Sequence, residues 1–147
     1  MKKIKLLSSS PINVDFGLFL IRLIIGLLMA FYGYEKLLHF QEMAASDFWA
    51  KNVSFLGING SFPLALTIFA ELFCSLLLLI GLFTRLILLP LLFCMGYIFL
   101  VVFPFSILDK GDNGYEFNTA FLYFIIYLGL FFTGPGNYSL DSKLLKK

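Results

Sequence analysis

The chain has 147 residues, of which 60% are hydrophobic and only 14% are charged, and its mean hydropathy is +0.92. Water-soluble domains carry about a quarter charged residues, so the composition excludes an ordinary soluble protein and predicts one integral membrane domain over 1–147. A formal net charge of +2, scattered along the chain, excludes a nucleic-acid-binding protein. Two cysteines and one histidine provide no zinc spacing, disulfide framework or bis-histidine haem site, so we expect no metal and no cofactor held by this chain's own ligands.

Four apolar stretches are long enough to cross a bilayer as helices, because a hydrocarbon core of about 30 Å needs roughly 20 residues. They predict membrane spans over 16–38, 62–83, 86–105 and 115–133. Only Thr84 and Arg85 separate the second span from the third, so these two helices should form a tight antiparallel hairpin. The expected fold is all-α, a polytopic membrane protein built as a four-helix transmembrane bundle.

The basic residues predict how the spans are oriented, because cytoplasmic loops carry an excess of lysine and arginine. One side of the membrane would hold Lys2, Lys3, Lys5, Arg85, Lys143, Lys146 and Lys147, with Arg22 near the same surface. The other side would hold Lys36, Lys51 and Lys110. We therefore expect both termini to be cytoplasmic, and the basic N-terminal residues to be a cytoplasmic head rather than a cleaved signal peptide.

The two expected outer loops differ in composition. Residues 41–58 mix aromatic with charged side chains, which predicts a short amphipathic helix in the headgroup layer, with Trp49 as an interfacial anchor. Residues 106–114 are rich in aspartate, glycine, asparagine and lysine, which indicates a turn.

The polar residues of the first span fall on one helical face. Arg22, Gly26, Gly33 and Lys36 share an arc of roughly 80° at 100° per residue. Gly26 and Ala30 form a pair of small residues that lets another helix come close. We therefore expect this face to be packed, with Gly26 and Gly33 as packing residues.

Two further stripes of polar and small residues follow the same periodicity: Thr67, Glu71, Cys74 and Ser75 in the second span, and Glu116, Ala120, Tyr123 and Tyr127 in the fourth. Glu71 lies about ten residues, or roughly 15 Å, from the expected outer end of its helix. A carboxylate at that depth is costly, so it should face protein or water and have a partner.

Lys36, Glu71 and Glu116 are therefore expected to converge in the outer half of the bundle, near Tyr123. Three interpretations are open. The group is an ion pair with a hydrogen-bonded carboxyl that fixes packing, or a site for a polar ligand head or a proton, or a set of partners for lipid headgroups. The second interpretation is physically reasonable because burial disfavours the charged form of an acid.

Other polar residues are weaker candidates. Cys74 and Cys94 lie at similar depth on the expected hairpin, which leaves a redox pair open, although buried lone cysteines usually act as small hydrophobic residues. His39 is expected to be a surface histidine at the interface, with proton handling as the alternative. Arg22 is expected to extend its guanidinium toward cytoplasmic phosphates.

Four pieces of the sequence, in order, resemble the DoxX family of bacterial membrane proteins. They are R-x3-G-x6-G-x2-K at 22–36, AELFCSLLLLIGLFTR at 70–85, GYEF at 114–117 and GPGNYSLD at 134–141. The resemblance runs from about residue 15 to 141, and it carries the family's charged positions onto Lys36, Glu71 and Glu116. Members often have His-Gly and Gln-Lys where this chain has Tyr32-Gly33 and Glu35-Lys36, so no role that needs that histidine is carried over.

The resemblance implies a multi-pass protein of the bacterial cytoplasmic (inner) membrane, associated with membrane oxidoreductases or with responses to oxidative and thiol stress. One expected function is a subunit of a quinone- or thiol-linked oxidoreductase system. Lys36, Glu71 and Glu116 would then bind quinone carbonyls or pass protons, and Tyr123 would donate a hydrogen bond. This function implies a bound quinone and a membrane or soluble redox partner. The alternatives are a carrier of a small solute or protons and a non-catalytic scaffold, and homo-oligomerisation is left open.

Overall fold

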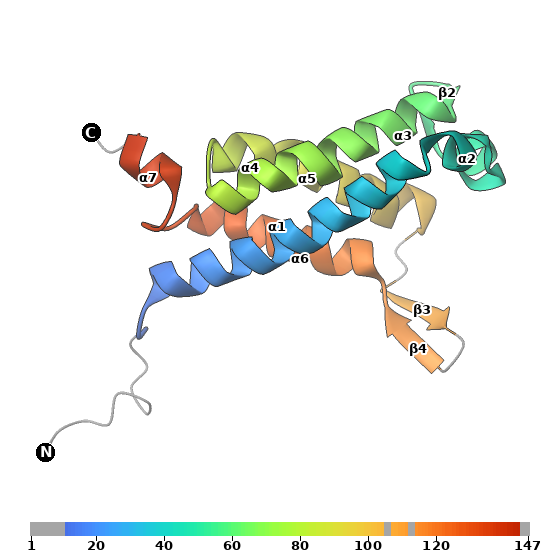
Figure 1. The fold of residues 1–147 in the computed structure, drawn as a ribbon. Helices are drawn as coiled ribbons and strands as arrows, with labels where there is room; N and C mark the ends of the chain where they lie inside the picture. Colours follow the sequence, from blue (N-terminus) through green and yellow to red (C-terminus); the bar gives the residue numbers. More distant parts are fainter. Residues whose placement is uncertain (1–10, 105–106, 112–113, 145–147) are drawn as a thin grey trace, which may run out of the picture.

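The computed structural model describes residues 11–104, 107–111 and 114–144, and most of these residues are helical (Figure 1). Four helical segments form the bundle: α1 (Val14–Leu38); α3 (Ser61–Ile68), η3 (Phe69–Cys74) and α4 (Ser75–Ile80), which continue into one another; α5 (Thr84–Tyr97) with η4 (Ile98–Val102); and α6 (Thr119–Thr133). The segments labelled η are π-helical turns.

Three of these segments are long and apolar enough to cross a membrane, namely Val14–Leu38, Ser61–Ile80 and Thr84–Val102. Their exposed side chains are mostly large and apolar, as contact with lipid requires. α6 is a shorter apolar helix that packs on α5. The expectation of a helical, multi-pass membrane protein is confirmed.

The fourth helix begins later than the sequence predicted. The side-chain Oδ1 of Asn118 accepts a hydrogen bond from the backbone N–H of Phe121 at 3.1 Å, which caps the helix so that it starts at Thr119. The preceding residues form an antiparallel hairpin of β3 (Leu108–Gly111) and β4 (Gly114–Phe117). The 15 residues of α6 reach about 22 Å. The prediction of helix from residue 115 was therefore wrong.

The single amphipathic helix expected over 41–58 is not formed; the chain here is divided into several short elements. The chain forms α2 (Phe40–Ala45), the π-helical turn η2 (Phe48–Asn52) and a hairpin of β1 (Ser54–Phe55) with β2 (Ile58–Asn59). Trp49 is 5% exposed and packs with Val53, Leu64 and Ile68. It is a core residue rather than the expected interfacial anchor, because the fold of this loop turns its ring toward α3.

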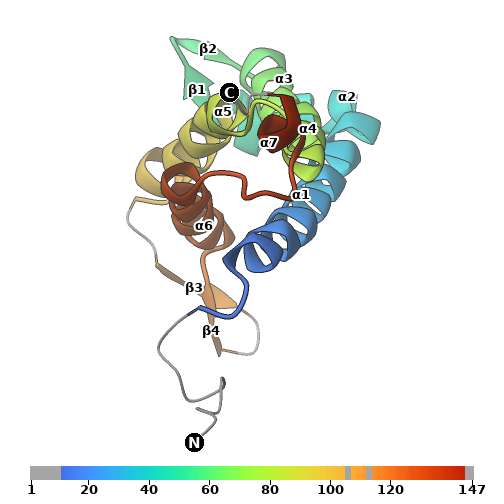
Figure 2. The same cartoon turned by 90° about the vertical axis from the view of Figure 1, so that its left-hand side faces the viewer.

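The two ends of the bundle differ. The end of α1 and both hairpins lie at one end, called here the hairpin end. The start of α1 and α7 (Leu140–Leu144) lie at the other end, called here the clasp end (Figure 1). Figure 2 views the bundle with the clasp end toward the reader and shows the chain after α6 crossing to α7, beside α4.

At two glycines, α1 lies very close to the second helical segment. A Cβ added at Gly33 would lie 2.6 Å from the backbone nitrogen of Leu72 and 2.9 Å from the carbonyl carbon of Glu71. A Cβ added at Gly26 would lie 3.1 Å from the carbonyl oxygen of Ser75. Such close approach of two backbones requires residues without side chains, and it brings the end of α1 alongside η3.

Replacing Gly33 with alanine is therefore expected to destabilise the protein by about 1–3 kcal/mol, the usual cost of overpacking. Gly17 is a matched control in the same helix, because an added Cβ there would have nothing within 4 Å. Gly17→Ala should be neutral or stabilising, since alanine is favoured over glycine in helices by about 1 kcal/mol. Thermal unfolding in detergent measures both, and equal stability of the two variants would contradict the close packing at Gly33.

The chain after α6, residues 134–144, lies across the clasp end and is called here the closing segment. Arg22 is 1% exposed, and its guanidinium donates hydrogen bonds to the carbonyl oxygens of Pro135 at 2.8 Å and Tyr138 at 2.6 Å. Both carboxylate oxygens of Asp15 accept hydrogen bonds from Asn137, at 2.8 and 2.7 Å. The expectation that Arg22 extends toward membrane phosphates was wrong, because backbone carbonyls inside the protein accept its hydrogen bonds.

Asp141 connects the same segment to the turn between α4 and α5. Its carboxylate accepts hydrogen bonds from the backbone N–H groups of Phe83 at 2.7 Å and Thr84 at 2.8 Å, which caps the start of α5. Its own N–H donates to the carbonyl of Gly81 at 2.9 Å. Residues 134–141 therefore end α6 and also attach its C-terminal end to α1 and to the α4–α5 turn.

Candidate functional site

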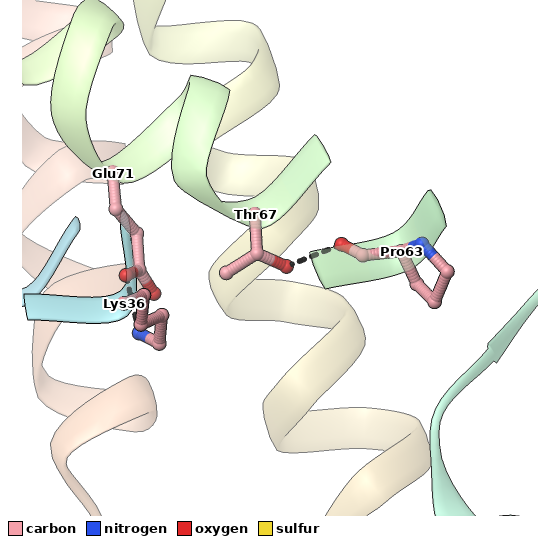
Figure 3. A network of polar contacts seen from close by, with 4 residues as sticks. All are labelled: Lys36, Pro63, Thr67 and Glu71. Atoms are coloured by element: carbon pink, nitrogen blue, oxygen red, sulfur yellow. Dashed lines mark hydrogen bonds and ion pairs between the residues drawn. The ribbon is translucent and has the colours of Figure 1, made fainter. Parts of the chain in front are cut away.

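A buried ion pair between Lys36 and Glu71 is the centre of the candidate site (Figure 3). Nζ of Lys36, near the end of α1, donates a hydrogen bond to Oε2 of Glu71 in η3. The side chain of Glu71 is 3% exposed and that of Lys36 is 19% exposed. Nζ also lies 5.9 Å from the centroid of the Tyr32 ring, within range of a cation–π interaction. The carboxylate and the aromatic face together stabilise the lysine charge.

Glu71 lies in a π-helical turn rather than in regular α-helix. The six residues of η3, Phe69–Cys74, bond at the wider i→i+5 spacing. About one turn earlier, the hydroxyl of Thr67 donates its hydrogen bond to the carbonyl of Pro63 at 2.9 Å (Figure 3). Short π-helical turns inside α-helices are frequent at functional sites, so the local backbone agrees with a special role for Glu71.

A cavity of about 260 Å³, called here the polar cavity, lies beside the ion pair. Its polar lining comes from three helical segments and the N-cap of α6: Tyr32, Lys36, Glu71, Asn118, Thr119 and Tyr123. Apolar side chains complete the wall, among them Met29, Met95 and Phe103. Tyr32 and Phe103 are also exposed on the surface of the bundle, so the cavity is open at that surface.

The structure brings together only some of the residues that the sequence selected. Lys36 and Glu71 are in direct contact, and Tyr123 lines the same cavity. Glu116 is exposed in β4 and does not line the cavity. The predicted convergence was therefore wrong for Glu116, because the helix that would have aligned it with Tyr123 starts three residues later.

Three polar residues of the cavity wall, Tyr32, Asn118 and Thr119, were not selected from the sequence as site residues. Tyr32 lies one helical turn before Lys36. This i, i+4 spacing predicts that the two side chains are neighbours on the surface of α1. Asn118 precedes an apolar run, which is a typical helix N-cap pattern. Its position also brings it to the cavity in place of Glu116.

The remaining candidates, His39, Cys74 and Cys94, do not line the polar cavity. His39 is exposed, and its Nδ1 lies 3.1 Å from the carbonyl oxygen of Glu35. Cys74 and Cys94 are free thiols that pack in the same hydrophobic core. Among the residues that the structure describes, no group of three His, Cys, Asp or Glu could hold a metal ion.

A multi-pass helical bundle with a buried lysine–glutamate pair beside a cavity that is open at its surface defines a small integral membrane protein with a polar site inside the bundle. The model of the DoxX family matches residues 17–104, more than half of the chain, and the protein belongs to the DoxX family. The matched region includes Lys36 and Glu71, whereas α6 and the closing segment lie beyond it. No curated protein and no solved structure matches the chain.

Proposed function

We propose that this protein is a membrane subunit of a quinone- or thiol-linked oxidoreductase system and binds a quinone headgroup in the polar cavity. The observation that carries the proposal is the ammonium of Lys36, paired with Glu71, in the wall of a cavity that is open at the surface of the bundle. An apolar cavity of about 150 Å³ holds benzene, so a cavity of about 260 Å³ has room for one substituted ring. The association of DoxX proteins with membrane redox systems, which the sequence resemblance implies, agrees with this assignment.

The residues around the cavity fit the chemistry of a quinone ring. Lys36 has three N–H donors, so it can bind a carbonyl oxygen while it remains paired with Glu71. The hydroxyl of Tyr123 is a second donor in the wall, and Met29 and Met95 offer the polarizable contacts that aromatic rings favour. A bound quinone would supply two-electron redox chemistry. Lys36 would orient its headgroup, and Glu71 would hold or release a proton at its carboxylate.

The proposal includes a redox partner. The sequence has one histidine and two cysteines, which is too few for the ligand set of a redox metal cluster. Electrons would therefore have to come from another membrane or soluble protein that docks on the bundle.

Quinone content after mild-detergent purification from native membranes tests the proposal. We expect about one quinone per wild-type chain and at least tenfold less in Lys36→Met, because a hydrogen bond from a charged donor contributes about 1.5–3 kcal/mol. Tyr123→Phe should lower the content several-fold, and it keeps the ring that packs in the core. Lys51→Met is the matched control, because Lys51 pairs with Asp47 on the exposed surface and does not line the cavity.

Gel filtration of each variant checks that it is folded before its quinone content is compared. A wild-type protein without quinone, or folded Lys36→Met and Tyr123→Phe variants with unchanged quinone content, would contradict the proposal.

A carrier of protons is the second candidate, and buried hydroxyls near Glu71 favour it. Ser75 and Tyr127 are fully buried, and neither hydroxyl oxygen has a hydrogen-bond partner among the described residues. Ser75 lies about one turn from Glu71 on the same helical segment, so water between them would extend the polar site toward the clasp end. Proton flux into vesicles that is lost in Glu71→Gln would support this candidate over the first.

A further inference from the structure

A second cavity, of about 300 Å³, lies between α3–η3 and α5, with Phe55 of β1 at its edge. We refer to it as the apolar cavity. Of the residues that line the two cavities, only Ile98 is common to both. The apolar cavity is therefore a separate space, on the other side of the contact between η3 and α5.

The sequence explains why this space is open. Small side chains line its buried part, at Thr67, Ala70 and Cys94, where the two helical segments run side by side. Larger rings, Phe69 and Phe93, stand at its exposed part. Small residues in the interior and bulky residues at the surface leave a space that opens toward lipid.

The polar groups of the apolar cavity already have partners. The Thr67 hydroxyl donates to the carbonyl of Pro63 at 2.9 Å, and the Tyr97 hydroxyl donates to the carbonyl of Ser54. The thiol of Cys94 is only a weak donor. The part of a ligand that enters this cavity must therefore be hydrocarbon.

The mouth of the cavity is built by aromatic contacts. The ring of Phe55 packs edge-on against Phe93, with centroids 5.7 Å apart, and against Tyr97, with centroids 6.5 Å apart. The hydrogen bond from Tyr97 to Ser54 attaches the β1–β2 hairpin to α5 beside this contact. The hairpin thereby fixes one wall of the cavity at the hairpin end of the bundle.

We propose that the apolar cavity binds one acyl chain of a phospholipid from the leaflet at the hairpin end. An unfilled apolar cavity loses dispersion contacts along its walls, and acyl chains are the hydrocarbon that reaches an opening on the lipid side. A phospholipid fits better than an isoprenoid quinone, because its polar head stays in the headgroup layer and needs no partner inside. A quinone head would need a donor, and the hydroxyls here are already hydrogen-bonded. This site is independent of the proposed quinone site.

Photolabelling in reconstituted vesicles tests the proposal, using a phosphatidylcholine with a diazirine near the end of one acyl chain. Peptide mass spectrometry should find several-fold more label at 66–70 and 93–98 than on the lipid-facing side of α1, at Leu23 and Ile24. Ala70→Leu fills the buried part of the cavity and should lower the cavity label several-fold. Ala65→Leu, on the exposed side of the same helix, is the matched control and should leave it unchanged.

If Ala70→Leu does not fold, Cys94→Leu is used in its place to fill the cavity. The ratio of cavity label to α1 label in the wild type also tests the proposal without any variant. Equal labelling of both surfaces would mean ordinary contact with bulk lipid and would overturn the proposal. Loss of the label on adding an isoprenoid quinone, with no loss on adding unlabelled phosphatidylcholine, would assign the cavity to the quinone and would also overturn it.

Discussion

Replacing Glu71 with leucine is expected to lower the free energy of unfolding by about 3–5 kcal/mol, because it leaves the charge of Lys36 buried without its carboxylate. Lys36→Met should be similarly destabilising, since the carboxylate of Glu71 is even more buried. The double variant Lys36→Met/Glu71→Leu should recover most of this loss, because apolar side chains often replace a buried ion pair at little cost. Unfolding titrations in mixed micelles measure all three.

The exposed ion pair between Asp47 and Lys51 is the internal control. Its atoms are 2.8 Å apart, but the two side chains are 84% and 69% exposed. Asp47→Asn should change the free energy of unfolding by no more than about 0.5 kcal/mol. Equal effects at the two pairs, or a double variant no more stable than the single ones, would contradict charge compensation as the role of Glu71.

The double variant also separates the scaffold hypothesis from the proposed function. If the pair only fixes packing, a folded double variant keeps whatever activity the protein has. If Lys36 holds a quinone head, the double variant folds but no longer retains the quinone. The stability of the double variant therefore tests charge compensation, and its quinone content separately tests quinone binding.

Helical periodicity was sufficient to place the packed face of α1. Arg22, Gly26, Gly33 and Lys36 fall on one side at 3.6 residues per turn, and in the structure this side contacts η3, α4 and the closing segment. Small residues spaced along a membrane helix predict where another backbone can approach. The contact between Lys36 and Glu71 follows from this geometry, because Gly33 brings the two backbones together one turn earlier.

The same periodicity failed at Glu116 because apolar runs do not show where a helix begins. GYEF is compatible with helix, but it is also the second strand of a hairpin in which four residue pairs align, from Leu108 opposite Phe117 to Gly111 opposite Gly114. The cap at Asn118 then fixes the start of α6. The signals for helix and for strand are of similar strength in this sequence, and the pairing of β4 with the adjacent strand β3 decided between them.

The π-helical turns and the partners of Arg22 were beyond sequence reasoning for another reason. A π-helical turn changes the phase of a helix without a characteristic residue pattern, so Glu71 in η3 looked like a residue of ordinary helix. Arg22 binds backbone carbonyls near the other end of the chain. Every residue has a carbonyl, so the sequence carries no signal for such a partner.

Replacing Arg22 with methionine is expected to release the closing segment from α1. The variant loses two hydrogen bonds from a charged donor, each contributing about 1.5–3 kcal/mol, and leaves the carbonyls of Pro135 and Tyr138 without this donor. Limited proteolysis should then cut residues 134–144 much faster than in the wild type, and unfolding should need less denaturant. Lys51→Met is the control, because Lys51 is an exposed basic residue of η2, at the hairpin end of the bundle.

Asp141 holds the same segment from the other side, so its variants show whether the segment acts as one unit. Asp141→Asn weakens the cap on Phe83 and Thr84 but leaves the bonds of Arg22 in place. If attachment is cooperative, the segment is already released once either residue is changed, and the double variant is little less stable than Arg22→Met alone. Strictly additive losses would contradict this, because additivity is expected of independent sites. The bonds of Arg22 and Asp141 would then stabilise the clasp end separately.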